Sequence, residues 1–246
     1  MKNTFPLALT FLTKVPWPRA LQAESRDLAR ALFWFPWVGA LLGLAFTGAW
    51  EGFSRVLPLP AAAALLVCFT VLCTGGLHLD GLADTVDGLG GGKDPEERRR
   101  IMKDSRVGVF GVLSLILALL LKFAFFLAAG EKGWGVEFII FPILSRWGMV
   151  FLAHLSDYAR PEGGLGQAMT TGVSRRTAAG AGLSALLLAV LVLGLKGLVL
   201  WAGAGAVIYL LSLYFRQALG GITGDVLGAA NEILEVAVLG GTLLLS

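Results

Sequence analysis

Three aspartates follow a long apolar run in the stretch Thr74–Gly88, and they are the residues best suited to chemistry in this chain. If the stretch is helical, Asp80, Asp84 and Asp87 stand at positions i, i+4 and i+7, within roughly a 60° arc of one helix face. Three like charges so close repel one another, so the pattern favours neutralisation by a divalent cation or a basic cluster.

The three aspartates offer only oxygen ligands, and such a set favours a hard cation. Mg²⁺ prefers oxygen donors and is commonly shared between one or two carboxylates and the phosphates of a substrate. Zinc sites use histidine and cysteine, and the whole chain has two of each. We therefore predict that Asp80, Asp84 and Asp87 contribute to a magnesium site.

A second acidic segment, Gly220–Glu235, lies near the end of the chain. Asp225 and Glu232 are seven residues apart and share a helix face, so both are candidate metal ligands. Asp225 has an equally good alternative interpretation as a helix N-cap. Glu232 has no such alternative, and an acid inside a membrane helix is functional by default.

Candidate anion-binding groups occur in three places. The segment Lys103–Arg106 carries two cations, a carboxylate and a hydroxyl to the start of an apolar run. Arg146 interrupts another apolar run and needs an anionic partner, either an aspartate or a bound phosphate. Arg160 lies in the loop 158–176, whose glycines and small polar residues are compatible with substrate contact. The charged run 94–103 predicts a solvated helix with Asp94 as N-cap.

The elements that must position these groups are membrane helices. Hydrophobic residues make up 56% of the chain, charged residues 15%, and the mean hydropathy is +0.76, which is typical of polytopic membrane proteins. About 20 apolar residues cross a bilayer. We predict an all-α bundle of about six to seven transmembrane helices, forming one integral membrane domain over 1–246 with site loops at about 75–108, 156–177 and 216–235. The expected spans are Ala31–Trp50, Val56–Leu79, Val107–Leu121, Val136–Leu155, Thr177–Leu195, Gly197–Phe215 and a last one starting near Asp225.

The distribution of basic residues predicts an orientation. Fifteen of the 20 lysines and arginines fall in the N-terminal segment and alternate loops, so that side is expected to face the cytoplasm together with the acidic motifs. Lys122 is expected near a helix end. Gly39 and Gly43 predict close packing of the first span on another helix. Phe11–Pro18 is expected to be an anchor at headgroup level.

Several motifs together resemble those of the cobalamin synthase family, also called adenosylcobinamide-GDP ribazoletransferases. They cover nearly the whole chain in order, and the Leu-His-Leu-Asp-Gly-Leu-Ala-Asp and Met-Lys-Asp-Ser-Arg elements are the most specific. The matching segments are Phe11–Pro18, Phe35–Gly39, Gly75–Gly88, Ile101–Gly108 and Gly221–Glu232. Two departures, Val86 and the glycines 90–92, touch no carboxylate.

The resemblance implies a Mg²⁺-dependent enzyme of the prokaryotic inner membrane, with its active site facing the cytoplasm. It would join adenosylcobinamide-GDP to α-ribazole or its 5′-phosphate, release GMP, and need no nucleic acid. A homo-oligomer or a complex with other cobalamin-assembly enzymes stays open.

The resemblance also implies roles for individual residues, which are assigned here as expectations. Mg²⁺ is expected on Asp80, Asp84 and Asp87, and a second metal on Asp225 and Glu232. Either Asp87 or Asp104 would accept the hydroxyl proton. The groups expected to hold phosphate or substrate are Lys103, Ser105, Arg106, Arg146 and Arg160.

Two alternatives use the same features. A membrane alcohol phosphotransferase of the phosphatidyltransferase type also clusters aspartates around Mg²⁺, but it needs an Asp-Gly-x-x-Ala-Arg element, and here Asp84 follows Ala83. A cation-coupled transporter would place acids at the membrane midplane and show paired broken helices as internal repeats, which this sequence lacks.

Overall fold

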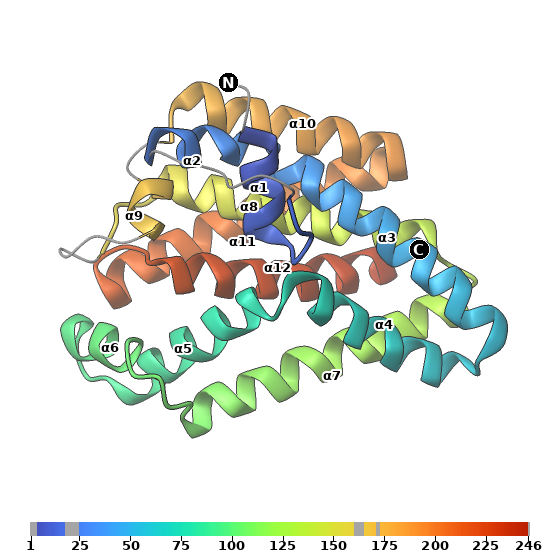
Figure 1. Cartoon of the computed structure of the whole chain (residues 1–246), viewed down its shortest axis with the longest axis horizontal. Coiled ribbons are helices and arrows are strands. Elements are labelled where there is room, and N and C mark those ends of the chain that lie inside the picture. Colours follow the sequence, from blue (N-terminus) through green and yellow to red (C-terminus); the bar gives the residue numbers. More distant parts are fainter. Residues whose placement is uncertain (1–3, 18–24, 160–164, 171–172, 246) are drawn as a thin grey trace.

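The computed structural model of this chain is a bundle of helices (Figure 1). It describes residues 4–17, 25–159, 165–170 and 173–245. Within those ranges, the only β-type pairing is an isolated bridge between Tyr158 and Ile222. The helices are α1 (Thr4–Leu12), α2 (Ser25–Ala31), η1 (Leu32–Trp34), α3 (Phe35–Val56), α4 (Leu59–Thr74), α5 (Leu77–Gly91), α6 (Pro95–Ile101), α7 (Val109–Glu131), η2 (Val136–Ile139), α8 (Ile140–Leu155), α9 (Leu165–Thr170), α10 (Arg175–Leu193), α11 (Leu195–Leu219) and α12 (Gly224–Leu244).

Six helical stretches in the described part of the chain are long and apolar enough to cross a membrane, and a bent helix pair makes up to seven. They run roughly parallel to the long axis of the molecule (Figure 1). Leucines and valines on α7, α10 and α11 are exposed along these helices, as expected for surfaces that face lipid. The predicted polytopic helical fold is confirmed, and the chain is a multi-pass membrane protein.

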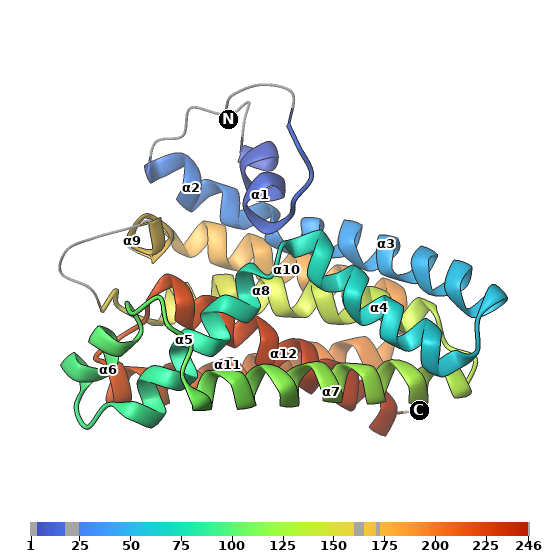
Figure 2. The ribbon, with the colours of Figure 1, turned by 60° about the horizontal axis from the view of Figure 1, so that its bottom comes forward.

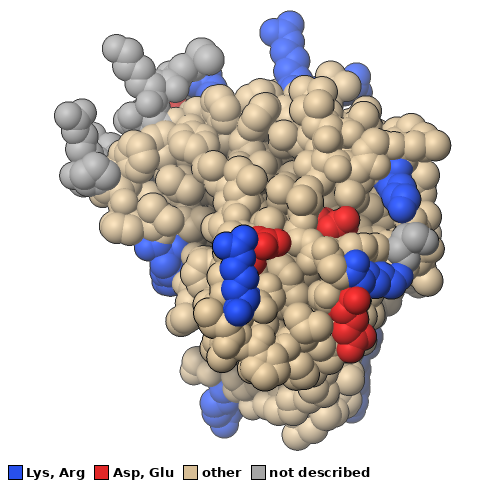
Figure 3. Space-filling view, turned by 90° about the vertical axis from the view of Figure 1, so that its right-hand side faces the viewer, with Lys and Arg blue, Asp and Glu red and all other residues tan. Residues whose placement is uncertain are grey.

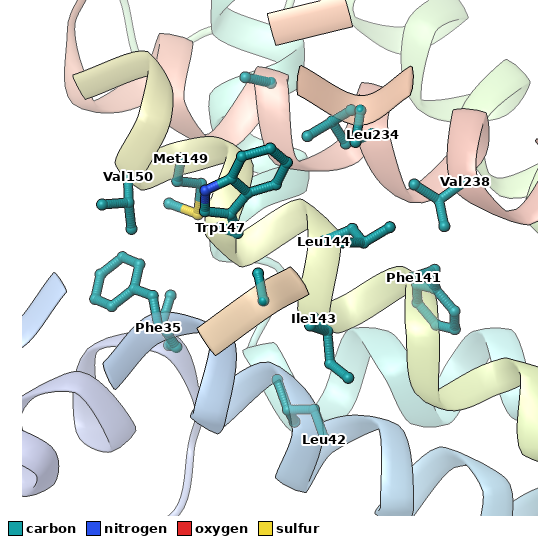
Figure 4. Packing of buried hydrophobic residues seen from close by; sticks show 14 of the residues in the cluster. Phe35, Leu42, Phe141, Ile143, Leu144, Trp147, Met149, Val150, Leu234 and Val238 are labelled. Atoms are coloured by element: carbon teal, nitrogen blue, oxygen red, sulfur yellow. The ribbon is translucent and has the colours of Figure 1, made fainter. Parts of the chain in front are cut away.

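Helix α8 lies at the centre of the bundle. Every residue from Ile140 to Val150 is buried, and Figure 4 shows α8 between α3 and α12. The predicted close packing of the first span is confirmed: a Cβ added at Gly39 would lie 2.3 Å from the Pro142 oxygen, and one at Gly43 would lie 2.6 Å from the Ile139 Cα. Only glycine allows the two backbones to approach this closely.

The second predicted span differs from the structure because it does not run on to Leu79. Helix α4 ends at Thr74, and α5 begins at Leu77 after a bend of 91°. Gly75 and Gly76, with φ of 65° and 72°, make the turn in a left-handed conformation that other residues rarely adopt. As Figure 2 shows, α4 and α5 form a V whose two arms lie along α7.

The N-terminal segment packs against this bend. Helix α1 lies on the outside of the bundle (Figure 2), and the Lys14 N–H donates to the Cys73 oxygen at 2.8 Å. The Lys14 side chain covers Gly75 so closely that a Cβ there would be 1.8 Å from Lys14 Cε. The segment therefore contacts the α4–α5 bend, while its level relative to the headgroups stays a prediction.

Charged side chains are sparse at the end of the bundle where α3 turns into α4. Figure 3 shows that most of this end is uncharged and that its lysines, arginines and acids are scattered over it. Glu51 and Arg55, in the last two turns of α3, form an exposed ion pair at 3.5 Å. The opposite end carries α6 and the loop leading to α7, where six lysines and arginines lie between 93 and 106.

Candidate functional site

The two acidic segments cross at their glycines. A Cβ on Gly81 of α5 would lie 2.6 Å from the Asp225 oxygen, and one on Gly228 of α12 would lie 3.2 Å from the His78 oxygen. The two helices run antiparallel through this contact, because moving forward along α5 means moving backward along α12. The stretch that carries Asp80, Asp84 and Asp87 is helical from Leu77 onward, and the crossing places Gly81, the neighbour of Asp80, against Asp225.

The acids at the crossing are accessible to different degrees. Asp80 is exposed, whereas Asp84 and Asp225 are half-buried. Asp225 does not cap its helix: Thr223 is the N-cap, and its hydroxyl accepts the Val226 N–H at 3.3 Å. Asp225 lies one residue inside the helix, where its carboxylate receives a 3.3 Å hydrogen bond from the Thr223 hydroxyl. The N-cap alternative for Asp225 is therefore wrong.

The Asp87 side chain faces the interior and accepts hydrogen bonds from the backbone at the start of α7. Its side chain is buried at 7% exposure, and its two carboxylate oxygens accept the N–H groups of Gly108 and Gly111, each at 2.7 Å. Gly108 is the N-cap residue of α7 and provides no side chain of its own. Asp87 thus caps α7 from another helix, where a negative charge is also favoured by the helix dipole.

The basic loop between α6 and α7 is held against α5 at both ends. At its start, Met102 packs so closely on Gly88 that a Cβ there would be 2.5 Å from Met102 Cγ. At its end, Gly108 donates to Asp87. Two consecutive residues of α5 therefore fix the ends of the loop. The predicted anion-binding side chains Lys103, Ser105 and Arg106 are exposed between these anchors.

Asp104 forms an ion pair within this loop. Its carboxylate accepts from the Arg106 side chain at 2.7 Å and from the Arg106 backbone N–H at 3.0 Å. These hydrogen bonds and the guanidinium charge lower the pKa of Asp104 to about 2. A carboxylate with that pKa is a weak proton acceptor at neutral pH.

A buried ionic network occupies the interior among α7, α8 and α12. Lys122 donates to Glu232 at 2.6 Å and to Glu235 at 2.5 Å. Arg146 pairs with Glu235, and Asn231 donates to Glu235 at 3.1 Å. Two cations and two carboxylates balance the charge, as removal of ions from water requires.

This network gives Glu232 and Arg146 protein partners. The anion expected beside Arg146 is Glu235, rather than an aspartate of α5 or a phosphate. The expectation that Lys122 lies near a helix end is wrong, because α7 extends to Glu131 and Lys122 lies inside it with 3% of its side chain exposed. The sequence did contain a signal for this network. Two apolar runs each carry one cation, Lys122 and Arg146, and the last span carries two acids, so the charges of these spans could have been paired with one another.

Part of the charged run 94–103 also has a structural role. Asp94 is confirmed as the N-cap of α6, since it accepts the Glu97 N–H at 2.9 Å. The charged run was predicted to be a solvated surface, but two of its arginines bind the protein instead. Arg98 donates to the Ala218 oxygen at 2.9 Å, and Arg99 donates to the Leu219 oxygen. These carbonyls end α11, so the arginines cap it. Arg160 lies outside the described residues.

The acids of the crossing are compatible with Mg²⁺ but do not form a complete protein cage. In the described ranges, no three histidine, cysteine, aspartate or glutamate side chains are grouped closely enough to hold a metal by themselves. Magnesium commonly needs only one or two carboxylates when phosphate oxygens and water complete its shell. Exposed Asp80 and half-buried Asp84 and Asp225 are carboxylates of that kind, on two helices that cross at Gly81 and Asp225.

Comparisons with known proteins agree along the whole chain. The family model described as Cobalamin-5-phosphate synthase matches residues 4–243. Proteins named Adenosylcobinamide-GDP ribazoletransferase are 42% identical in Syntrophobacter fumaroxidans, over 97% of both chains, and 41% identical in Pseudomonas putida, over 98% of both. A third, from Geotalea daltonii, is 38% identical over 97% of this chain and 96% of its own. No solved structure gives a significant match. The chain belongs to the cobalamin-5-phosphate synthase family.

Proposed function

We propose that this protein transfers the adenosylcobinamide-phosphate group of adenosylcobinamide-GDP to α-ribazole or its 5′-phosphate, with release of GMP. The main support is the family match over residues 4–243, joined to curated relatives that carry this activity in their name. The crossing of α5 and α12 at Gly81 and Asp225 supports the location of the site. Neither alternative function has comparable support.

The proposed reaction is an in-line phosphoryl transfer. A ribazole hydroxyl oxygen attacks the phosphorus that carries cobinamide, and a new P–O bond forms. The P–O bond to the GMP phosphate breaks, and its electron pair leaves with GMP. Negative charge grows on the oxygens of the diphosphate, so positioning and charge stabilisation do most of the catalytic work.

We assign Asp80, Asp84 and Asp225 to the diphosphate end of the site. These carboxylates would hold Mg²⁺, which supplies charge neutralisation for a diphosphate when bound. Arg106 and Lys103 approach from the loop fixed to the next turns of α5 and would bind phosphate oxygens directly. Ser105 lies between them and would donate a hydrogen bond.

The remaining predicted site residues fit better as scaffold. Asp87 caps α7 and so positions the basic loop. Glu232 and Arg146 belong to the buried network with Lys122 and Glu235. In Asp104 the low pKa and the pairing with Arg106 disfavour the role of proton acceptor. The hydroxyl proton is then best accepted by a phosphate oxygen of the substrate, since the carboxylates assigned to Mg²⁺ are not free to take it.

We further propose that this end of the bundle faces the cytoplasm at the inner membrane. Fifteen of the 20 lysines and arginines belong to the N-terminal segment and the loops expected on that side. Water-soluble nucleotide substrates would then reach the crossing directly.

The test measures GMP release from adenosylcobinamide-GDP and α-ribazole in membranes, as a function of Mg²⁺ concentration. Asp84→Asn and Asp225→Asn should lower the rate and raise the Mg²⁺ concentration for half-maximal activity. Glu96→Gln, which removes an exposed carboxylate from α6, is the matched control and should leave both unchanged.

The two possible failures differ in what they refute. Absence of GMP release by the wild type would overturn the proposed reaction. Normal release by Asp84→Asn and Asp225→Asn, with an unchanged Mg²⁺ requirement, would overturn the proposed site and leave the reaction standing.

A further inference from the structure

A cavity lies away from the acidic crossing, among α8, α10 and α11. Its volume is about 750 Å³. Trp147 faces it from α8, while the neighbouring Arg146 pairs with Glu235 of α12. Helix α5, which carries the acids, packs on α12 and α7, whereas the cavity lies on the side of α8 that faces α10 and α11. It is therefore not the place of the proposed transfer.

The walls of the cavity are aromatic and aliphatic. The Trp147 ring stacks on Trp201 with 5.0 Å between centroids and on Phe151 with 5.5 Å. Small residues on the facing helices, including Gly182 and Gly205, leave the space open beside these rings. A Cβ at either glycine would already lie within 3.3 Å of the Trp147 ring. Such walls favour an apolar chain.

The ionisable groups of the lining lie toward one end. Arg175 begins α10 and His154 lies near the end of α8, and both are exposed lining residues. Tyr209 lies near this end on α11, which runs antiparallel to α10. Seven residues of helix separate Arg175 from Gly182, a rise of about 10 Å. No carboxylate is among the lining residues, so the charged end of the cavity is positive.

The cavity opens on the outer surface of apolar helices. Leu183 lines it and is 67% exposed, and Tyr209, also in the lining, is 52% exposed. Both residues belong to helices long and apolar enough to span a membrane. A basic mouth at the membrane boundary and an apolar interior between helices are the features that hold an anionic lipid.

We infer that this cavity binds an anionic phospholipid. Its phosphate lies against Arg175 and His154, and one acyl chain runs along Phe151, Trp147 and Trp201. The charge at the mouth selects this occupant over a zwitterionic lipid, because a guanidinium binds a phosphate that bears unbalanced negative charge more strongly.

The test uses the tryptophans as reporters. The protein is reconstituted into phosphatidylcholine vesicles that contain a small fraction of lipid with brominated acyl chains, either phosphatidylglycerol or phosphatidylcholine. Bromine quenches indole fluorescence on contact. The wild type should be quenched more by brominated phosphatidylglycerol than by the same fraction of brominated phosphatidylcholine.

Three variants locate the effect. Arg175→Ala should lower the apparent affinity for brominated phosphatidylglycerol about fivefold, the worth of one cation near the membrane surface. Arg176→Ala is the matched control, because it removes the adjacent exposed arginine, which does not line the cavity. Ala178→Leu combined with Ala202→Leu fills the cavity and should abolish the excess quenching.

Equal quenching of the wild type by the two brominated lipids would overturn the inference, and a second copy of the chain or a substrate seated in the cavity would give that result. Equal loss of affinity in Arg175→Ala and Arg176→Ala would show a general surface attraction and would overturn it as well. Excess quenching that persists in the filled variant would place the lipid outside this cavity and would also overturn the inference.

Discussion

Replacing Asp87 with asparagine separates a positioning role from a metal-binding role. The structure gives each carboxylate oxygen of Asp87 one backbone N–H at 2.7 Å, from Gly108 and Gly111. Asparagine has the same shape as aspartate and keeps one acceptor oxygen. Its NH₂ group replaces the other oxygen and cannot accept a hydrogen bond from the second backbone N–H. One charge-assisted hydrogen bond is lost, and a buried donor at the start of α7 has no acceptor.

The expected loss of stability follows from these two bonds. A hydrogen bond to a charged group contributes about 1.5–3 kcal/mol, and an unsatisfied buried donor costs a similar amount. Asp87→Asn should therefore lower the free energy of unfolding by about 2–3 kcal/mol. Asp87→Ala removes both acceptors and should cost about 3–5 kcal/mol, since two N–H groups at the start of α7 then lose their charged partner.

Two measurements on purified protein in detergent check this reasoning. Unfolding by denaturant should show the lower midpoint, and GMP release should show a reduced kcat with an unchanged Mg²⁺ concentration for half-maximal rate, because the loop carrying Arg106 is displaced. Asp84→Asn should instead unfold at the wild-type midpoint, lower the rate of GMP release and raise the Mg²⁺ concentration for half-maximal rate. Wild-type unfolding of Asp87→Asn, together with a raised Mg²⁺ requirement, would refute the capping role and restore Asp87 as a ligand.

Two further predictions concern other charges. Lys122→Met leaves Glu232 buried without its cation, so it should lower the free energy of unfolding by about 3–5 kcal/mol; Lys122→Met with Glu232→Gln should recover much of that loss, and a double mutant no more stable than the single one would contradict the network. The lowered pKa of Asp104 means that its ion pair with Arg106 is fully formed above the usual aspartate pKa and is lost only as the pH falls toward about 2. Asp104→Asn should therefore leave the shape of the pH–rate profile of GMP release unchanged between about pH 5 and pH 8, and loss of its acidic limb would identify Asp104 as the base after all.

Much of the architecture was predictable from local sequence. Charge-free runs of about 20 residues located most spans, because a helix is the simplest way to satisfy every backbone group in lipid. Spacing alone placed Gly39 and Gly43 on one packing face, and Asp94 before Pro95 was enough to identify the start of α6. These features depend on residues close together in the chain.

The partners of the buried charges required the tertiary structure. Lys122 and Glu232 are 110 residues apart, and Asp87 and Gly108 are 21 apart. No periodicity in the sequence says that Arg146 faces Glu235 and not a phosphate, or that Asp87 turns inward while Asp80 stays exposed.

The sequence by itself determined that this chain is a bundle of membrane helices with acidic motifs on α5 and α12, because hydropathy and motif spacing are local properties. Only the tertiary structure decided which acids are buried against protein partners and which are exposed. The 91° bend after Thr74 sets the direction of α5 and thereby its contact with α12 and α7. A charge buried in that packing must be neutralised by a nearby group, and the groups near it in space come from distant parts of the chain.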